Sequence, residues 1–146
     1  MRHRGFAFPD DLLYSRHHVW ARVDGHIVTV GITDFMQRKA GEIVYVELPP
    51  QGQRVEHEKP CLSFESGKWV GRLYSPFTGE VTKRNLSLED DPSLLNSDPY
   101  GKGWIIQVKA EPELLEKEMA QLMKPGPELV EFINSEIARI SDTVSN

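Results

Sequence analysis

The sequence has a single cysteine, Cys61, among its 146 residues. One thiol excludes an internal disulfide framework and a cysteine-rich zinc site. No apolar run approaches the length of a membrane-spanning helix, and the basic start MRHRGFAFPDD lacks the apolar stretch of a secretory signal. The net charge of -5 comes without a dominant basic stripe, which argues against nucleic-acid binding. These absences predict a cytoplasmic protein with no nucleic-acid or membrane partner.

The composition is that of an ordinary globular protein, with 39% hydrophobic and 27% charged residues. The length predicts one domain with a terminal appendage. We divide the chain into a polar N-terminal lead-in (residues 1–15), a strand-rich domain (16–124) and a C-terminal helical extension (125–146).

The middle of the chain is dominated by short strand patterns. About seven apolar or alternating runs lie between residues 18 and 108, and they are separated by glycine, proline and Asp-Gly pairs. Asp24-Gly25 between β-forming runs predicts a hairpin with a type I′ turn, which needs positive φ at both central residues. Short strands at this spacing favour a mainly β fold, a sandwich or flattened barrel with short helices.

Helices are expected at the edges of this pattern. One begins at Thr33 or Asp34 and ends at Gly41, and a short one lies within DPSLLNSDPYGKGW. Two apolar helical stripes follow, and packing on the core is the favoured interpretation of both: Leu115, Met119 and Leu122, then Leu129, Ile133, Ile137 and Ile140. For the C-terminal helix, an oligomer seam is the alternative, and the sequence does not decide between the two.

A lysine stands at the tip of the predicted hairpin CLSFESGKWVGRLYSPFTGEV. Gly67-Lys68 has the form of a two-residue type II′ turn, in which Gly67 takes the positive φ and Lys68 projects into solvent. On this local pattern alone, Lys68 is read as an ordinary solvated side chain.

The wider sequence resembles the glycine-cleavage H protein family over about residues 14–123. ESGKWVGRLYSPFTGEV is similar to its lipoyl-lysine hairpin, VTVGITDFMQRKAGEIVYVELPP to its segment before that hairpin, and LLNSDPYGKGWIIQVK to a later strand. The resemblance implies a flattened, hammerhead-like β-barrel or sandwich with C-terminal helices, so that residues 16–124 form an H-protein-like lipoyl domain. It also implies lipoate in amide linkage on Lys68.

The resemblance further implies a carrier subunit rather than an enzyme. A lipoyl arm is a covalent group carrier that visits several active sites. Glu65 is then read either as a contact of the enzyme that attaches lipoate or as a solvated charge. The implied partners are a lipoate ligase or a lipoyl synthase/transferase system, and dihydrolipoamide dehydrogenase.

An enzyme using His17, His18 and His26 is the alternative. Adjacent residues in a strand point to opposite faces, so His17 and His18 do not easily bind one metal. The sequence has no nucleophile elbow, phosphate loop or Cys/His ligand set. We therefore expect no catalytic residue and no metal.

Two positions depart from the family at the expected arm pocket. The family has acids that hold a cationic aminomethyl cargo, and this chain has Val19 and Arg72 there. An arginine suits an anionic cargo, with His17 nearby and Trp69 against the arm. We therefore expect the lipoate-binding paralogue of sulfur-oxidising prokaryotes, whose arm carries sulfur-bound intermediates for a heterodisulfide-reductase-like complex. The alternative is a glycine cleavage H protein that works with P and T proteins.

Other interpretations remain open at this point. Arg72 could pair with Glu65 across the hairpin, and the pocket could be rebuilt from other residues. Cys61 could exchange with the lipoyl sulfurs, although a structural thiol is favoured. SDPYGKGW could be a docking loop, although a turn that packs Tyr100 and Trp104 is favoured.

Overall fold

The structure is a computed structural model that describes residues 1–145, with side chains through residue 140. Its described strands are β1 (Arg2–His3), β2 (Phe6–Ala7), β3 (Leu13–Tyr14), β4 (Val19–Asp24), β5 (Ile27–Ile32), β6 (Ile43–Glu47), β7 (Arg54–Val55), β8 (Pro60–Ser66), β9 (Val70–Tyr74), β10 (Gly79–Arg84) and β11 (Ile106–Ala110). Its helices are α1 (Asp34–Ala40), α2 (Ser87–Asp90), α3 (Leu94–Ser97), α4 (Pro112–Met119) and α5 (Pro127–Ser145).

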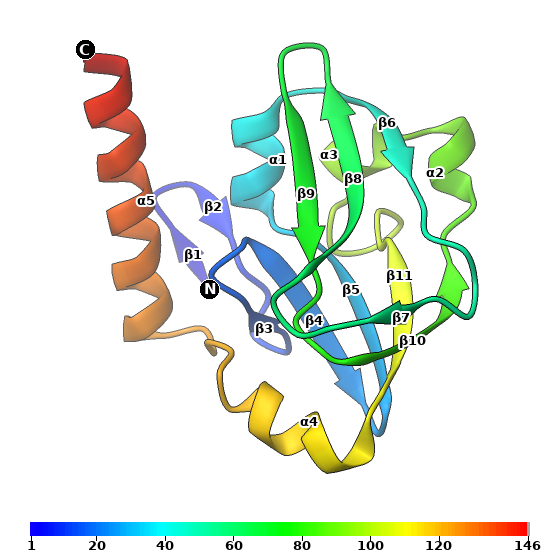
Figure 1. Cartoon of the computed structure of the whole chain (residues 1–146). Coiled ribbons are helices and arrows are strands. Elements are labelled where there is room, and N and C mark those ends of the chain that lie inside the picture. The colour runs from blue at the N-terminus through cyan, green and yellow to red at the C-terminus, as the bar shows by residue number, and fades with distance from the viewer. Residues whose placement is uncertain (146) are drawn as a thin grey trace.

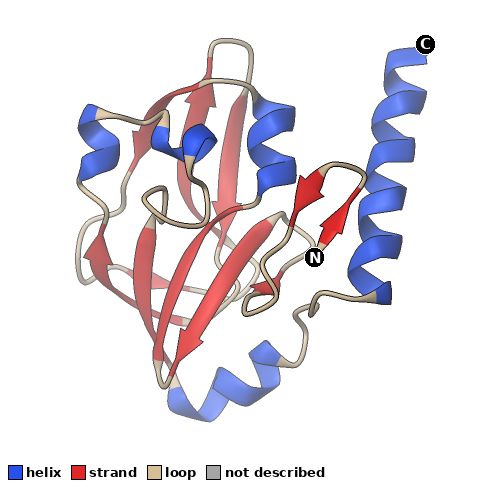
Figure 2. Ribbon diagram, turned by 180° about the vertical axis from the view of Figure 1, so that it is seen from behind, coloured by secondary structure: helices blue, strands red, loops and turns tan. Residues whose placement is uncertain are grey.

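Two antiparallel sheets form the body of the molecule (Figure 1). One has the order β3-β4-β5-β11-β10-β7 and the other the order β6-β8-β9, while β1 and β2 pair only with each other. The β8–β9 hairpin extends beyond the rest of its sheet, and α5 stands beside the β1–β2 hairpin (Figures 1 and 2). The prediction of a mainly β fold with helices is confirmed.

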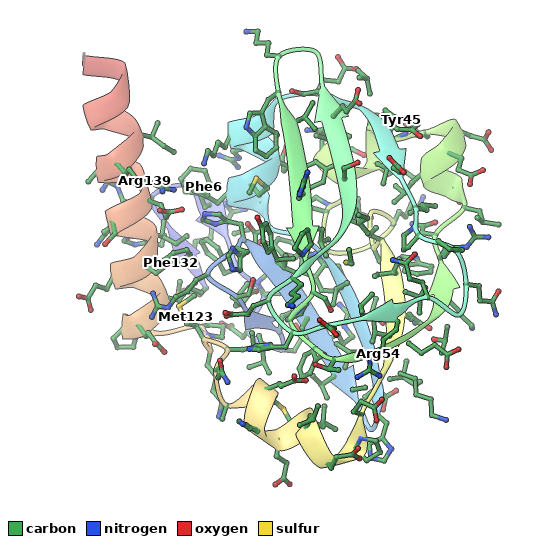
Figure 3. The ribbon with its side chains drawn as sticks, viewed as in Figure 1. Phe6, Tyr45, Arg54, Met123, Phe132 and Arg139 are labelled. Carbon is green, nitrogen blue, oxygen red and sulfur yellow. The ribbon has the colours of Figure 1, made fainter. Side chains whose placement is uncertain are left out.

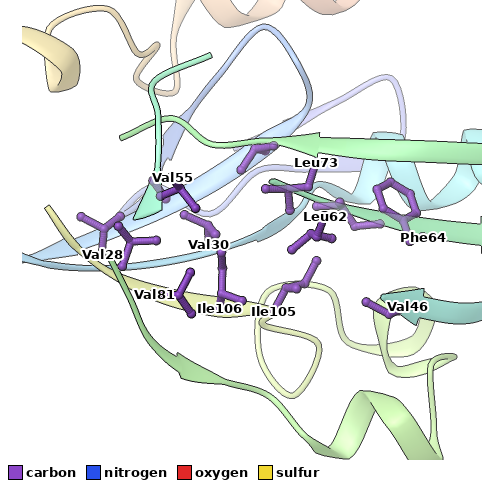
Figure 4. Packing of buried hydrophobic residues seen from close by; sticks show 14 of the residues in the cluster. Val28, Val30, Val46, Val55, Leu62, Phe64, Leu73, Val81, Ile105 and Ile106 are labelled. Atoms are coloured by element: carbon purple, nitrogen blue, oxygen red, sulfur yellow. The ribbon is translucent and has the colours of Figure 1, made fainter. Parts of the chain in front are cut away.

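The first hydrophobic core lies between the two sheets (Figure 4). Alternate residues of each strand point into it because successive side chains of a strand face opposite sides. The six-stranded sheet contributes Val28, Val30, Val81, Ile106 and Val108, and the three-stranded sheet contributes Val46, Leu62, Phe64 and Leu73. The first predicted helical stripe packs here through Leu115, Met119 and Leu122, as expected.

A second core joins the N-terminus to the C-terminal helix. Residues 1–15, which we predicted as a polar lead-in, supply Phe8, Leu12 and Tyr14 to it, all at most 1% exposed. The second predicted stripe, on α5, covers these residues with Leu129, Ile133, Ile137 and Ile140. Tyr100 and Trp104 also pack against this core, so the packing interpretation of SDPYGKGW is confirmed.

The predicted start and end of α1 are confirmed, whereas the predicted type I′ turn at Asp24-Gly25 is not. Thr33 caps α1 by accepting a hydrogen bond from the Met36 N–H, and Gly41 ends the helix at φ 81°. Asp24 pairs with Ile27 in the β4–β5 ladder, so the loop is Gly25-His26. Of these two residues only Gly25 has positive φ, at 62°. The type I′ prediction is wrong because the ladder extends through Asp24 and leaves a single left-handed position.

None of the described helices combines the length and the apolar character that a membrane span would require.

Candidate functional site

Lys68 lies at the exposed end of the β8–β9 hairpin. Glu65 pairs with Val70 as the last rung of the ladder, so the loop consists of residues 66–69. Within the described part of the chain Lys68 forms no ion pair, and its backbone N–H donates to Ser66 Oγ at 3.4 Å. The ammonium group is therefore open to approach from solvent.

The loop does not have the predicted type II′ geometry. Gly67 is not among the residues with positive φ, and a Cβ built on it meets no atom within 4 Å. The Ser66 N–H donates to the Trp69 carbonyl at 2.8 Å and closes a loop with two residues between these partners. Gly67 leaves open space beside Lys68, but no left-handed backbone requires glycine there.

Trp69, the neighbour of Lys68, is folded back onto the hairpin. Its ring meets that of Phe64 edge to face, with centroids 5.7 Å apart. A Cβ on Gly71 would lie 2.2 Å from the Trp69 ring, so Gly71 provides the space that the indole occupies. The aromatic side chain next to Lys68 is thereby held against the hairpin.

A groove of about 550 Å³ runs from Trp69 along β9. The hairpin, the turn at residues 16–18, α1 and α5 surround it. The lining residues are Arg16, His17, His18, Met36, Trp69, Val70, Gly71, Arg72, Tyr74, Glu136 and Arg139. Three of the four residues predicted for the arm pocket, His17, Trp69 and Arg72, thus lie on one groove.

The fourth predicted pocket residue, Val19, is placed elsewhere. It is 1% exposed, belongs to the first core and does not line the groove. His17 stacks on Tyr74, with ring centroids 4.3 Å apart. Arg72 lies opposite Ser63 on β8, and no ion pair joins it to Glu65 among the described residues.

His18 is buried between the strands and α5. Its ring stacks on Phe35 and Phe132, at 4.9 and 5.1 Å between centroids, and its Nε2 lies 2.5 Å from Glu136 Oε1. Burial lowers the pKa of His18 below its usual 6.5, and the hydrogen bond to Glu136 opposes this only in part. The described residues contain no group of three or more His, Cys, Asp or Glu side chains that could hold a metal.

We expect His18 to make the stability of the protein depend on pH. Because its pKa is lower in the folded state than in the unfolded chain, the unfolded chain binds more protons below about pH 6.5. The free energy of unfolding should therefore be highest above that pH and decrease as the pH falls toward 5. In His18→Asn, which keeps a residue that tolerates the φ of 63°, the melting temperature should decrease less steeply over this range. Equal slopes in both proteins would contradict this assignment.

Glu136 and Arg139 on α5 are site residues that the sequence analysis missed (Arg139 is labelled in Figure 3). Arg139 Nη2 lies 3.0 Å from each carboxylate oxygen of Glu136. One signal could have identified Glu136: it follows Ile133 by three residues and precedes Ile140 by four, which places it at the flank of the buried stripe.

Cys61 lies at the base of the hairpin, on the strand that leads to Lys68. Burial raises its pKa to about 12, and its Sγ contacts the Leu73 carbonyl at 3.5 Å. A thiol in this environment is protonated at neutral pH and is a poor nucleophile. These features agree with the structural role favoured from the sequence.

Comparison with known proteins gives consistent matches. A family model described as "Glycine cleavage H-protein" matches residues 12–135. The glycine cleavage system H protein of Rubrobacter xylanophilus is 50% identical over 112 residues, which cover 75% of this chain and 89% of that protein. Glycine cleavage system H protein 2 of Aquifex aeolicus is 43% identical over 140 residues, or 94% of this chain and 84% of that one. The crystal structure of a glycine cleavage system H protein from Mycobacterium marinum superposes with a TM-score of 0.75 at 29% identity, covering 88% of this chain and 98% of the other.

Proposed function

This chain belongs to the glycine cleavage H-protein family, and from that premise we propose that it is a non-enzymatic carrier with lipoate in amide linkage on Lys68. The observation that carries the proposal is the position of Lys68, exposed at the end of a hairpin and next to a groove. Both features fit a lipoyl arm on this lysine. The lysine is accessible to the enzyme that attaches lipoate, and the groove offers a binding surface for the free end of the arm.

The residues around the anchor have distinct roles in this proposal. Acylation of the Lys68 amine removes its charge, and lipoate would supply a dithiol at the end of a flexible chain. Gly67 leaves the space beside Lys68 open, and Trp69 lines the groove. Glu65, three residues before Lys68, is the proposed contact of the lipoate ligase or of the lipoyl synthase/transferase system.

We propose an aminomethyl group as the cargo, with the P and T proteins and dihydrolipoamide dehydrogenase as partners. The matched proteins are named glycine cleavage system H proteins, and the comparisons do not support the sulfur-oxidation hypothesis or a heterodisulfide-reductase-like partner. That hypothesis relied on the loss of acids at Val19 and Arg72. Both positions lie in segments that resemble the family. Glu136, on helix α5, supplies a carboxylate to the groove from outside those segments.

The test is a direct comparison of two reactions on the lipoylated protein. With glycine and P protein, it should support glycine decarboxylation exchange. After incubation of the reduced protein with thiosulfate or a persulfide donor, intact-mass measurement should show no stable sulfur adduct. The unlipoylated protein, which should be inactive in both measurements, is the control. A sulfur adduct without glycine exchange would overturn the proposed cargo and leave the carrier role in place.

A further inference from the structure

We infer that Glu136 is the cargo-binding carboxylate of the groove, and that Arg139 occupies it when no cargo is bound. The ligand class is a small primary ammonium group at the end of the arm. The inference rests on the proposed function, because it assumes an arm on Lys68. It goes beyond that function by assigning the cargo contact to α5.

Glu136 has the only carboxylate among the described residues that line the groove. Its side chain is 13% exposed, and His18 Nε2 holds one of its oxygens at 2.5 Å. A shielded cation needs an acceptor or anionic partner, because an unpaired buried charge is costly. Glu136 is a preoriented partner of this kind.

Arg139 is a weak partner for this carboxylate. It lies three residues further along the same helix, and its side chain is 66% exposed. Because the guanidinium is mostly exposed, water screens this pair from the Arg139 side, and a pair of this spacing contributes little to stability. An arriving ammonium group brings the same charge and hydrogen-bond donors on a compact centre. It can therefore replace the guanidinium without leaving Glu136 unpaired.

The other cationic side chains that line the groove weaken the binding of an ammonium group but do not prevent it. Arg16 is already paired with Glu128 at 3.0 Å. Arg72 is exposed, so water screens its repulsion of a bound cation. Arg72 should lower the affinity of the groove for cations, and the carboxylate should remain the main electrostatic contact.

The pair lies outside the part of the chain that the family model matches. The family model matches residues 12–135, and both Glu136 and Arg139 lie beyond it. The family's two acid positions are Val19, in the core, and Arg72, at the groove. In this chain the long helix α5 therefore supplies the carboxylate of the groove.

The experiment measures how long the lipoylated protein retains the ammonium-bearing cargo. The reduced arm is loaded with formaldehyde and ammonium, so that loading does not depend on P protein. Loss is hydrolysis without oxidation or reduction: water cleaves the carbon–sulfur bond, the thiol re-forms, and formaldehyde and ammonium leave. Ammonium release and intact mass are followed with time after removal of the reagents.

Three single variants separate the roles of the charges. Glu136→Gln keeps an oxygen that can accept from His18 but removes the charge, and loss should be about tenfold faster, equivalent to about 1.4 kcal/mol. Arg139→Gln removes the competing cation, and loss should be about twofold slower, as expected from the small energy of such a pair. Glu131→Gln, at an exposed position of the same helix outside the groove lining, should not change the rate.

A binding measurement provides a readout that does not use the loaded arm. Methylammonium added to the lipoylated protein should shift the NMR signal of the Arg139 Nε–H in a saturable way, and Glu136→Gln should abolish the shift. Faster cargo loss in Arg139→Gln would show that the guanidinium holds the cargo, and it would overturn the inference. So would an unchanged rate in Glu136→Gln at an unchanged melting temperature. Failure of the proposed function would appear differently, as absence of lipoate on Lys68 or of exchange with P protein.

Discussion

Lys68→Arg should abolish carrier function completely and leave the fold unchanged. An arginine keeps the positive charge, but its guanidinium stays protonated and cannot be acylated at neutral pH. Because Lys68 is exposed and has no ion pair among the described residues, the free energy of unfolding should change by at most about 0.5 kcal/mol. Tryptic mass spectrometry should find the lipoyl increment on the Lys68 peptide of the parent protein and nowhere in the variant.

Lys83→Arg is the control, since Lys83 is another exposed lysine, on strand β10. It should be lipoylated normally and should support glycine exchange at the parent's rate. Lipoate on another lysine, with Lys68 unmodified in the parent protein, would contradict the assignment of the attachment site.

Gly79→Ala should cause the largest loss of stability among the glycine variants considered. Gly79 begins β10 and pairs with Ala110 on one side and with Val55 on the other. A Cβ at this position would lie 2.1 Å from the backbone oxygen of Lys109. Because the clashing atom belongs to the backbone, the clash can be removed only by opening the β10–β11 ladder. We therefore expect the free energy of unfolding to decrease by about 3 kcal/mol or more. Chemical denaturation of the two proteins measures the difference.

Gly67→Ala is the control for that variant. Its added Cβ meets nothing within 4 Å and its backbone is not left-handed, so the free energy of unfolding should change by less than about 0.5 kcal/mol. If both variants unfolded at the same denaturant concentration as the parent, the close approach at Gly79 would be refuted. A large loss in Gly67→Ala alone would restore the type II′ turn that the sequence favoured.

Features that depend on neighbours in the sequence were predictable. Thr33 and Gly41 bound α1 because a cap acts on the adjacent helical turn. The stripe on α5 follows from a period of 3.6 residues, and the β8–β9 hairpin from alternation on both sides of a loop. Periodicity could not indicate a role for Lys68 at the tip of this hairpin. The resemblance to the family did, because it implies lipoate attachment there.

Turn geometry was less predictable, because register decides which residues remain in the loop. Asp24-Gly25 has the composition of a type I′ turn, yet Asp24 stays in the ladder and the turn begins one residue later. Gly67 and Lys68 do lie between the bonded partners Ser66 and Trp69, as predicted, but Gly67 does not take the positive φ of a type II′ turn. At Asp24-Gly25 the pairing of the whole strands outweighs the preference of two residues.

The sequence by itself therefore determined the class of fold, the hairpin and the lysine at its tip, since these follow from short-range periodicity and from motifs in order along the chain. Only the tertiary structure decided the composition of the groove. Val19 and Glu136 are 117 positions apart; the first is covered by the core, and the second is brought to the groove by the packing of α5 on the N-terminal segment. Which side chains share a groove is set by contacts between distant segments, and no local pattern encodes those contacts.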